Sequence, residues 1–147
     1  MHASLSQMFE RLIHAPQRTR AARSVEWFGW LMLFEAAVLL CSPHAVAQLL
    51  QLPALSPQAA NYFRLVGLLV AGLGMLYVVS GRLNAEGFVF ASLLDRPLVP
   101  PVMLLLWWLD IVPGPLALLF AVSDGLSFLW TLHAWRAQER APLARAA

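Results

Sequence analysis

The chain has 147 residues, of which 60% are hydrophobic and only 12% are charged, with a formal net charge of +2. Soluble domains carry about 25% charged residues because their surface faces water, so this composition excludes an ordinary soluble domain. All ten basic residues are arginine, but no basic stretch with interleaved aromatic residues lies outside the apolar segments, which argues against nucleic-acid binding. The single cysteine, Cys41, has no internal disulfide partner, and no Cys/His spacing indicates a metal site, so no cofactor is expected.

Residues 1–24 are predicted to form a cytoplasmic segment that contains one short amphipathic helix. Apolar side chains recur at helical spacing within residues 4–14, and Ser4 and Gln7 have the spacing of a capping box. Several arginines lie on the polar side of this stretch or just after it, and Pro16 ends it. The pattern is typical of a helix that lies on a membrane surface; a weakly ordered terminus is the alternative.

Four apolar segments follow, at about residues 25–42, 60–80, 87–109 and 115–135. At about 1.5 Å per residue, helices of these lengths cross a hydrocarbon core of about 30 Å, although the first is a little short. The third contains Pro97, Pro100 and Pro101, which remove backbone donors and predict a kink. The sequence therefore predicts an all-α, integral membrane four-helix bundle over residues 25–135, followed by a cytoplasmic tail at 136–147.

The placement of arginine predicts the topology. Arginines cluster before the first span, after the second and after the fourth, whereas the loops at 43–59 and 110–114 contain neither Arg nor Lys. The positive-inside rule then puts both termini in the cytoplasm, in a multi-pass protein of the bacterial inner membrane. Residues 19–47 have an alternative interpretation as a signal peptide cleaved after the Ala-Val-Ala at 45–47, which would leave three spans. Glu35 interrupts the apolar core of that segment, so four spans are favoured.

Ionisable residues inside the spans are the candidate functional residues. A charge at the bilayer centre costs about 2.5–3.5 kcal/mol on insertion scales, so such residues normally have a partner or a use. Arg64 shares a helical stripe with small glycines, and Asp124 shares one with small alanines, so both are predicted to face the bundle interior. Depth along the spans makes Arg96 the predicted partner of Glu35 or Asp124. The predicted buried polar cluster is Glu35, Arg64, Asp95, Arg96 and Asp124.

The charges in this cluster do not balance, because three carboxylates face two guanidinium groups. One hypothesis is that Glu35, Asp95 or Asp124 holds a proton at neutral pH, since burial disfavours the charged form. That group would carry a proton, donate to a ligand or act as counter-ion to a cationic one. The alternative is that the charges only fix how the helices pack. Asn61 and Tyr62 border the outward end of the second span and are predicted to line a pocket entrance.

One family resemblance covers about residues 60–135. The stretch Arg64-Leu-Val-Gly67, with the later Gly72, Gly74 and Tyr77, resembles small four-helix bacterial inner-membrane proteins of the DoxX-like type. The stretch from Asp124-Gly125 to Trp130-Thr131 resembles the closing helices of uncharacterised relatives of that size. The resemblance implies a four-helix bundle beside a membrane redox or thiol-linked assembly and supplies no catalytic residues. The lone Cys41 departs from a thiol-exchange role. A second likeness, in four helices and buried acids, is to sterol-isomerase and sigma-2-like membrane proteins, and it implies a cationic or carbocationic ligand.

The expected function is that of an accessory or small-molecule-binding subunit and not an enzyme. The expected partners are the lipid bilayer, a membrane protein and a lipophilic small molecule. The alternative is a membrane-embedded enzyme or proton-coupled carrier for a lipophilic molecule, in which a buried carboxylic acid among Glu35, Asp95 and Asp124 is the acid–base group.

Overall fold

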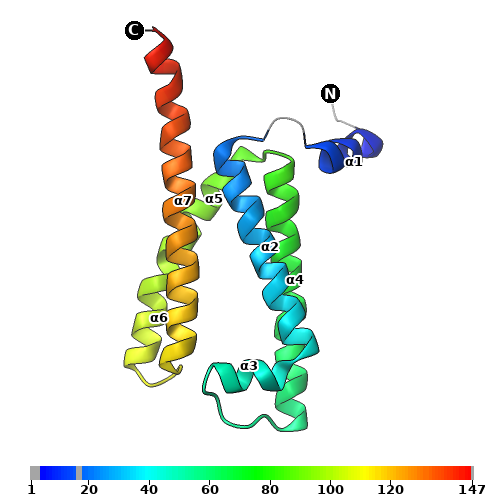
Figure 1. The fold of residues 1–147 in the computed structure, drawn as a ribbon, viewed down its shortest axis with the longest axis vertical. Helices are drawn as coiled ribbons and strands as arrows, with labels where there is room; N and C mark the ends of the chain where they lie inside the picture. The colour runs from blue at the N-terminus through cyan, green and yellow to red at the C-terminus, as the bar shows by residue number, and fades with distance from the viewer. Residues whose placement is uncertain (1–3, 16–17, 147) are drawn as a thin grey trace.

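The computed structural model describes residues 4–15 and 18–146, with side chains as far as residue 140, and over these residues it contains helices and turns but no strand (Figure 1). The all-α class is confirmed. The helices are α1 (Leu5–His14), α2 (Arg20–Cys41), α3 (Pro43–Leu49), α4 (Pro57–Arg82), α5 (Glu86–Asp95), the 3-10 turn η1 (Arg96–Leu98), α6 (Val99–Trp108) and α7 (Gly114–Ala146).

The four predicted spans are confirmed as helices that are long and apolar enough to cross a membrane: Arg20–Cys41, Pro57–Arg82, Glu86–Trp108 and Gly114–Arg140. The first two begin several residues before the predicted windows, after capping residues. The Thr19 hydroxyl accepts the backbone N–H of Ala22, and the Ser56 hydroxyl accepts that of Ala59. At the other end of the chain, α7 continues as helix through the predicted tail to Ala146.

The third span is broken where its prolines predict a kink, which confirms that prediction. Helix α5 ends at Asp95, the turn η1 follows, and α6 starts at Val99. Pro97, Pro100 and Pro101 have no N–H to donate to the carbonyl four residues earlier, so the regular α-helical pattern is interrupted here. In Figure 1, α5 is inclined against α6, which runs along α7. The break therefore turns the chain at Arg96.

Helices α2 and α4 pack with their backbones in contact. A Cβ atom added to Gly29 would lie 2.8 Å from the carbonyl oxygen of Gly74, and one added to Gly81 would lie 2.7 Å from that of Ala22. Small residues at steps of seven make this approach possible, as in left-handed helix pairs. The two facing rows are Ala22, Gly29 and Ala36 on α2, and Gly67, Gly74 and Gly81 on α4.

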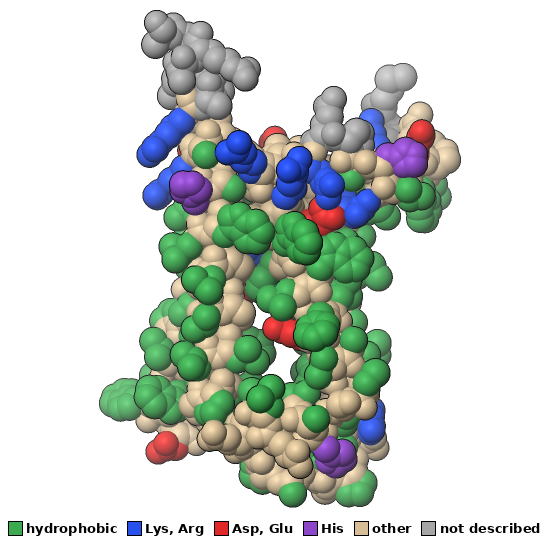
Figure 2. All heavy atoms as spheres, in the orientation of Figure 1, with side chains coloured by type: hydrophobic (Ala, Val, Ile, Leu, Met, Phe, Trp, Pro, Cys, Tyr) green, Lys and Arg blue, Asp and Glu red, His purple; other side chains and the backbone are tan. Residues whose placement is uncertain are grey.

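The spans form two pairs. Helix α2 packs along α4, α6 packs along α7, and α2 also contacts α7. The pairs approach each other near the end that carries α1 and separate towards the opposite end, where Figure 2 shows an opening between them. Helix α3 and its loop lie at that opposite end (Figure 1). Closure of all four spans into one bundle stays a prediction.

Helix α1 begins with the predicted capping box, in which Ser4 and Gln7 exchange side-chain to backbone hydrogen bonds. None of its residues is buried, and Leu5, Phe9 and Ile13 are exposed. Its placement on a membrane surface stays a prediction.

Candidate functional site

Arg96 lies in the break of the third span, and its side chain contacts one residue from each of the other three spans. The break in the third span turns its side chain inward, and the residue is only 1% exposed. Its guanidinium carbon lies 4.2 Å from the ring centre of Phe28 on α2 and 5.0 Å from that of Tyr77 on α4. Its Nη1 donates to the hydroxyl of Thr131 on α7, at 3.1 Å. Cation–π contact with two rings stabilises the charge away from water.

Buried hydroxyl groups connect this arginine to α2 and α7. The hydroxyl oxygens of Thr131 and Ser24 lie 2.8 Å apart. Thr131 donates to the Ser127 carbonyl at 2.9 Å, so its oxygen is the acceptor in the contact with Ser24. The single O–H of Ser24 is within hydrogen-bond distance of both the Thr131 hydroxyl and the Ala21 carbonyl, each at 2.8 Å, and donates to one of them at a time. These hydrogen bonds hold the acceptor of Arg96 in place. The contact between α2 and α7 is therefore polar at this level, unlike the glycine contact between α2 and α4.

The guanidinium of Arg96 has more donors than the surrounding protein uses. Among the described residues, its Nε and Nη2 are buried and have no hydrogen-bond partner. A buried donor without a partner costs about 1–3 kcal/mol, so such groups normally meet an acceptor. Two of the three guanidinium nitrogens are thus able to bind an acceptor that is not part of the described chain.

Glu35 on α2 and Asp124 on α7 are half-buried acids that belong to different helix pairs. In the part of the chain with described side chains, however, the ion pairs within 4.0 Å all involve Glu26. No ion pair within 4.0 Å links Arg96 to Glu35 or Asp124 among these side chains, and the partnership of Arg96 with one of these acids stays a prediction. Figure 2 shows an acidic side chain at the edge of the opening between the helix pairs.

Arg64 and Asp95 do not join this group, and their predicted burial is wrong because both are exposed. Helix α4 turns its seven-residue row of small side chains towards α2, and Arg64 lies outside that row, where it donates to Asn61 at 3.0 Å. Asp95 directly precedes Arg96, about 100° away around the helix, and lies on the exposed side while Arg96 is buried.

The predicted pocket entrance is an exposed polar group. Asn61 and Tyr62 are both exposed beside Arg64, and the Tyr62 hydroxyl accepts a hydrogen bond from Gln58 at 2.8 Å. An entrance at this place stays a prediction.

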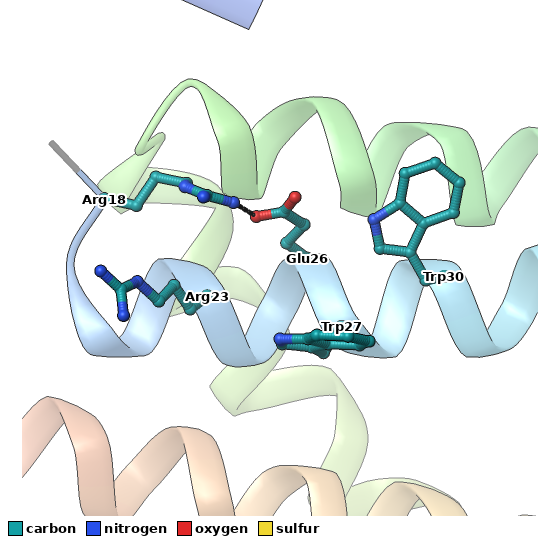
Figure 3. Close-up of a pocket in the computed structure, with 5 residues that line it drawn as sticks. All are labelled: Arg18, Arg23, Glu26, Trp27 and Trp30. Atoms are coloured by element: carbon teal, nitrogen blue, oxygen red, sulfur yellow. Dashed lines mark hydrogen bonds and ion pairs between the residues drawn. The ribbon is translucent and has the colours of Figure 1, made fainter. Parts of the chain in front are cut away.

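A second polar cluster, around Glu26, was not predicted. The Glu26 side chain is 7% exposed and pairs with Arg18 and, at 3.2 Å, with Arg82 (Figure 3 shows the Arg18 contact). Arg82 also donates to the carbonyls of Leu12 and Ile13, at 2.6 and 2.8 Å. The cluster therefore ties the end of α1 to α2 and α4. The available signal was an acidic residue at the start of the first span, shortly after three arginines in sequence.

Four long apolar helices with polar side chains between them indicate a multi-pass membrane protein. In comparisons with known proteins, no family model matches the chain, and no curated protein or solved structure matches it.

Proposed function

We propose that this is a four-span protein of the bacterial inner membrane that binds a lipophilic small molecule between its two helix pairs. The proposal puts both termini in the cytoplasm. It is supported by the arginines at the ends of the spans, which gather at the end that carries α1 and the C-terminal part of α7 (Figure 2). The protein then acts as an accessory or binding subunit. The resemblance to DoxX-like proteins stays part of this proposal.

The observation that carries the proposal is the buried guanidinium of Arg96, whose Nε and Nη2 have no partner among the described residues. Asp124 lies seven residues before Thr131, two turns away on the same side of α7, and so faces the same interior. Arg96 would bind an acceptor on the ligand, such as a carbonyl or phenolate oxygen. Glu35 and Asp124 would bind a donor or a cationic group. The apolar spans around the opening favour a ligand that arrives from the bilayer.

Native mass spectrometry of the protein, purified in mild detergent, tests this function. The expected result is a small molecule bound near one per chain in the wild type and lost in Arg96→Met and Asp124→Asn. Asp110→Asn is the matched control, because Asp110 is an exposed acid in the loop between α6 and α7. Wild-type protein that carries no small molecule, or carries it equally in all variants, would contradict the proposal. A stoichiometric protein partner without a small molecule would contradict small-molecule binding and support only the accessory role.

A second candidate is a proton-coupled carrier or an enzyme for a lipophilic molecule. It is favoured by Glu35 and Asp124, two half-buried acids that belong to different helix pairs. Infrared difference spectroscopy over a pH titration detects a carboxylic acid by its C=O band. The carrier requires a band that Glu35→Gln or Asp124→Asn removes and that the exposed-site control Asp95→Asn leaves in place.

A further inference from the structure

A pocket of about 470 Å³ lies beside the first part of α2 (Figure 3). The residues that line it are Arg18, Arg23, Glu26, Trp27 and Trp30. In Figure 3 the two arginines lie at the start of α2, and the two tryptophans lie further along the helix, towards the middle of the span. The pocket therefore has a cationic end and an aromatic end.

The cationic end has an excess of positive charge. Glu26 is the acid of the pocket, and its carboxylate is already bound by Arg18 and Arg82. Arg23 is exposed, and no ion pair links it to any residue with a described side chain. Three arginines against one glutamate leave a net charge of +2 at this place. Guanidinium groups in this arrangement suit the oxygens of a phosphate, which accept two N–H donors from one fork.

The aromatic end has the composition of a membrane–water boundary. Trp27 and Trp30 are 63% and 47% exposed, so their rings are not used to pack the protein interior. They follow Arg23 by one and two turns of helix, about 6 and 10 Å along the axis at about 1.5 Å per residue. Tryptophan rings concentrate at this depth because one edge bears an N–H and the rest is apolar.

Helix α1 marks the same level independently. It lies crosswise to the spans in Figure 1, and Arg82 of the Glu26 cluster holds its C-terminal end. Its exposed apolar side chains include Leu5 and Phe9, and in Figure 2 the hydrophobic side chains of this region lie on the side towards the spans. A helix of this kind rests at the boundary between headgroups and acyl chains. The cationic end of the pocket is then at the level of lipid phosphates.

We propose that this pocket binds the phosphate group of an anionic phospholipid in the leaflet on which α1 lies. Arg23 and the donors of Arg18 that Glu26 does not use bind the phosphate oxygens, and Trp27 and Trp30 contact the glycerol and the upper acyl chains. Basic pockets at the ends of membrane helices select anionic headgroups in this way. The site is separate from the one around Arg96.

Native mass spectrometry of the full chain in mild detergent, with equal amounts of phosphatidylglycerol and phosphatidylcholine added, tests this site. The wild type is expected to retain phosphatidylglycerol about tenfold more than phosphatidylcholine, which corresponds to about 1.4 kcal/mol. Arg23→Gln should abolish this preference. Arg136→Gln is the matched control, because Arg136 is an exposed arginine of α7 towards the same end and does not line the pocket.

Equal losses in Arg23→Gln and Arg136→Gln would overturn the proposal, because the preference would then follow total charge and not the pocket. Millimolar inorganic phosphate separates the two sources of a phosphate group. Retention of phosphatidylglycerol in its presence supports a lipid site, and displacement by it would overturn the lipid assignment. Arg23 is the residue to change because it is exposed and supports no described ion pair, so the fold should survive. Its loss should leave small-molecule retention at Arg96 unchanged, which distinguishes the two sites.

Discussion

At the end of the molecule that carries α1, the carboxylate of Glu26 binds two guanidinium groups. In the break of the third span, by contrast, the guanidinium of Arg96 binds one hydroxyl and none of the carboxylates with described side chains. The first cluster pairs its carboxylate internally and joins three helices. The second keeps buried donors that no described residue uses. The Glu26 carboxylate therefore stabilises the fold, while the guanidinium of Arg96 carries a cost that a ligand would offset.

The largest expected effect comes from breaking the α2–α4 contact on which both clusters depend. Gly29→Leu puts a side chain into the backbone of α4, since even a Cβ would lie 2.7 Å from the amide nitrogen of Val78. We expect the free energy of unfolding to fall by about 3 kcal/mol, at the upper end for overpacked sites. Denaturation in mixed detergent, followed by circular dichroism, measures it. Gly72→Leu is the control, because nothing lies within 4 Å of a Cβ there; similar losses in both variants would contradict the pairing.

The second-largest effect is expected at the Glu26 cluster. Glu26→Gln leaves Arg18 and Arg82 without their counter-charge. Because both arginine side chains are more than a quarter exposed, we expect the free energy of unfolding to fall by about 2 kcal/mol, which is less than the loss for fully buried pairs. Limited proteolysis between α1 and α2 should also speed up, since Arg82 anchors the end of α1. Glu10→Gln, at an exposed position on α1, should change neither quantity.

Arg96→Met tests whether the two clusters differ in role. If Arg96 were purely structural, its substitution would lower the free energy of unfolding as much as Glu26→Gln does. The variant loses one hydrogen bond and two ring contacts but also removes a buried charge, so we expect the free energy of unfolding to change by no more than about 1 kcal/mol. Ligand retention should be lost. A fall in stability as large as that of Glu26→Gln, measured in the same detergent titration, would make Arg96 a structural residue.

The smallest effect is expected at the hydroxyl contact between α2 and α7. Ser24→Ala removes the partner of Thr131 and should cost about 0.6 kcal/mol, the average for hydrogen bonds between membrane helices. Ser123→Ala is the control, because that hydroxyl donates only to the Phe120 carbonyl of its own helix. If both variants unfold at the same detergent fraction, the Ser24–Thr131 contact does not stabilise the approach of the two helix pairs.

Several features could be predicted without a structure because they depend on neighbours along the chain. The four long helices follow from the length of the apolar segments, and the break at Arg96 follows from prolines that lack an N–H. The capping box of α1 follows from two side chains three residues apart. These properties need no knowledge of what each helix packs against.

The tertiary structure decided how each helix is rotated about its axis. That rotation depends on the best close contact between helices far apart in sequence, here the rows that contain Gly29 and Gly74. This rotation of the helices buried Arg96, left Arg64 exposed and brought Glu26 to Arg82, 56 residues away along the chain. A stripe of small residues on one helix indicates which of its sides can pack closely. Only the helix that packs against it determines which of its charged side chains are buried. The sequence by itself therefore determined the class of protein and the length of its helices, and the packing determined which charges are paired and which remain available to a ligand.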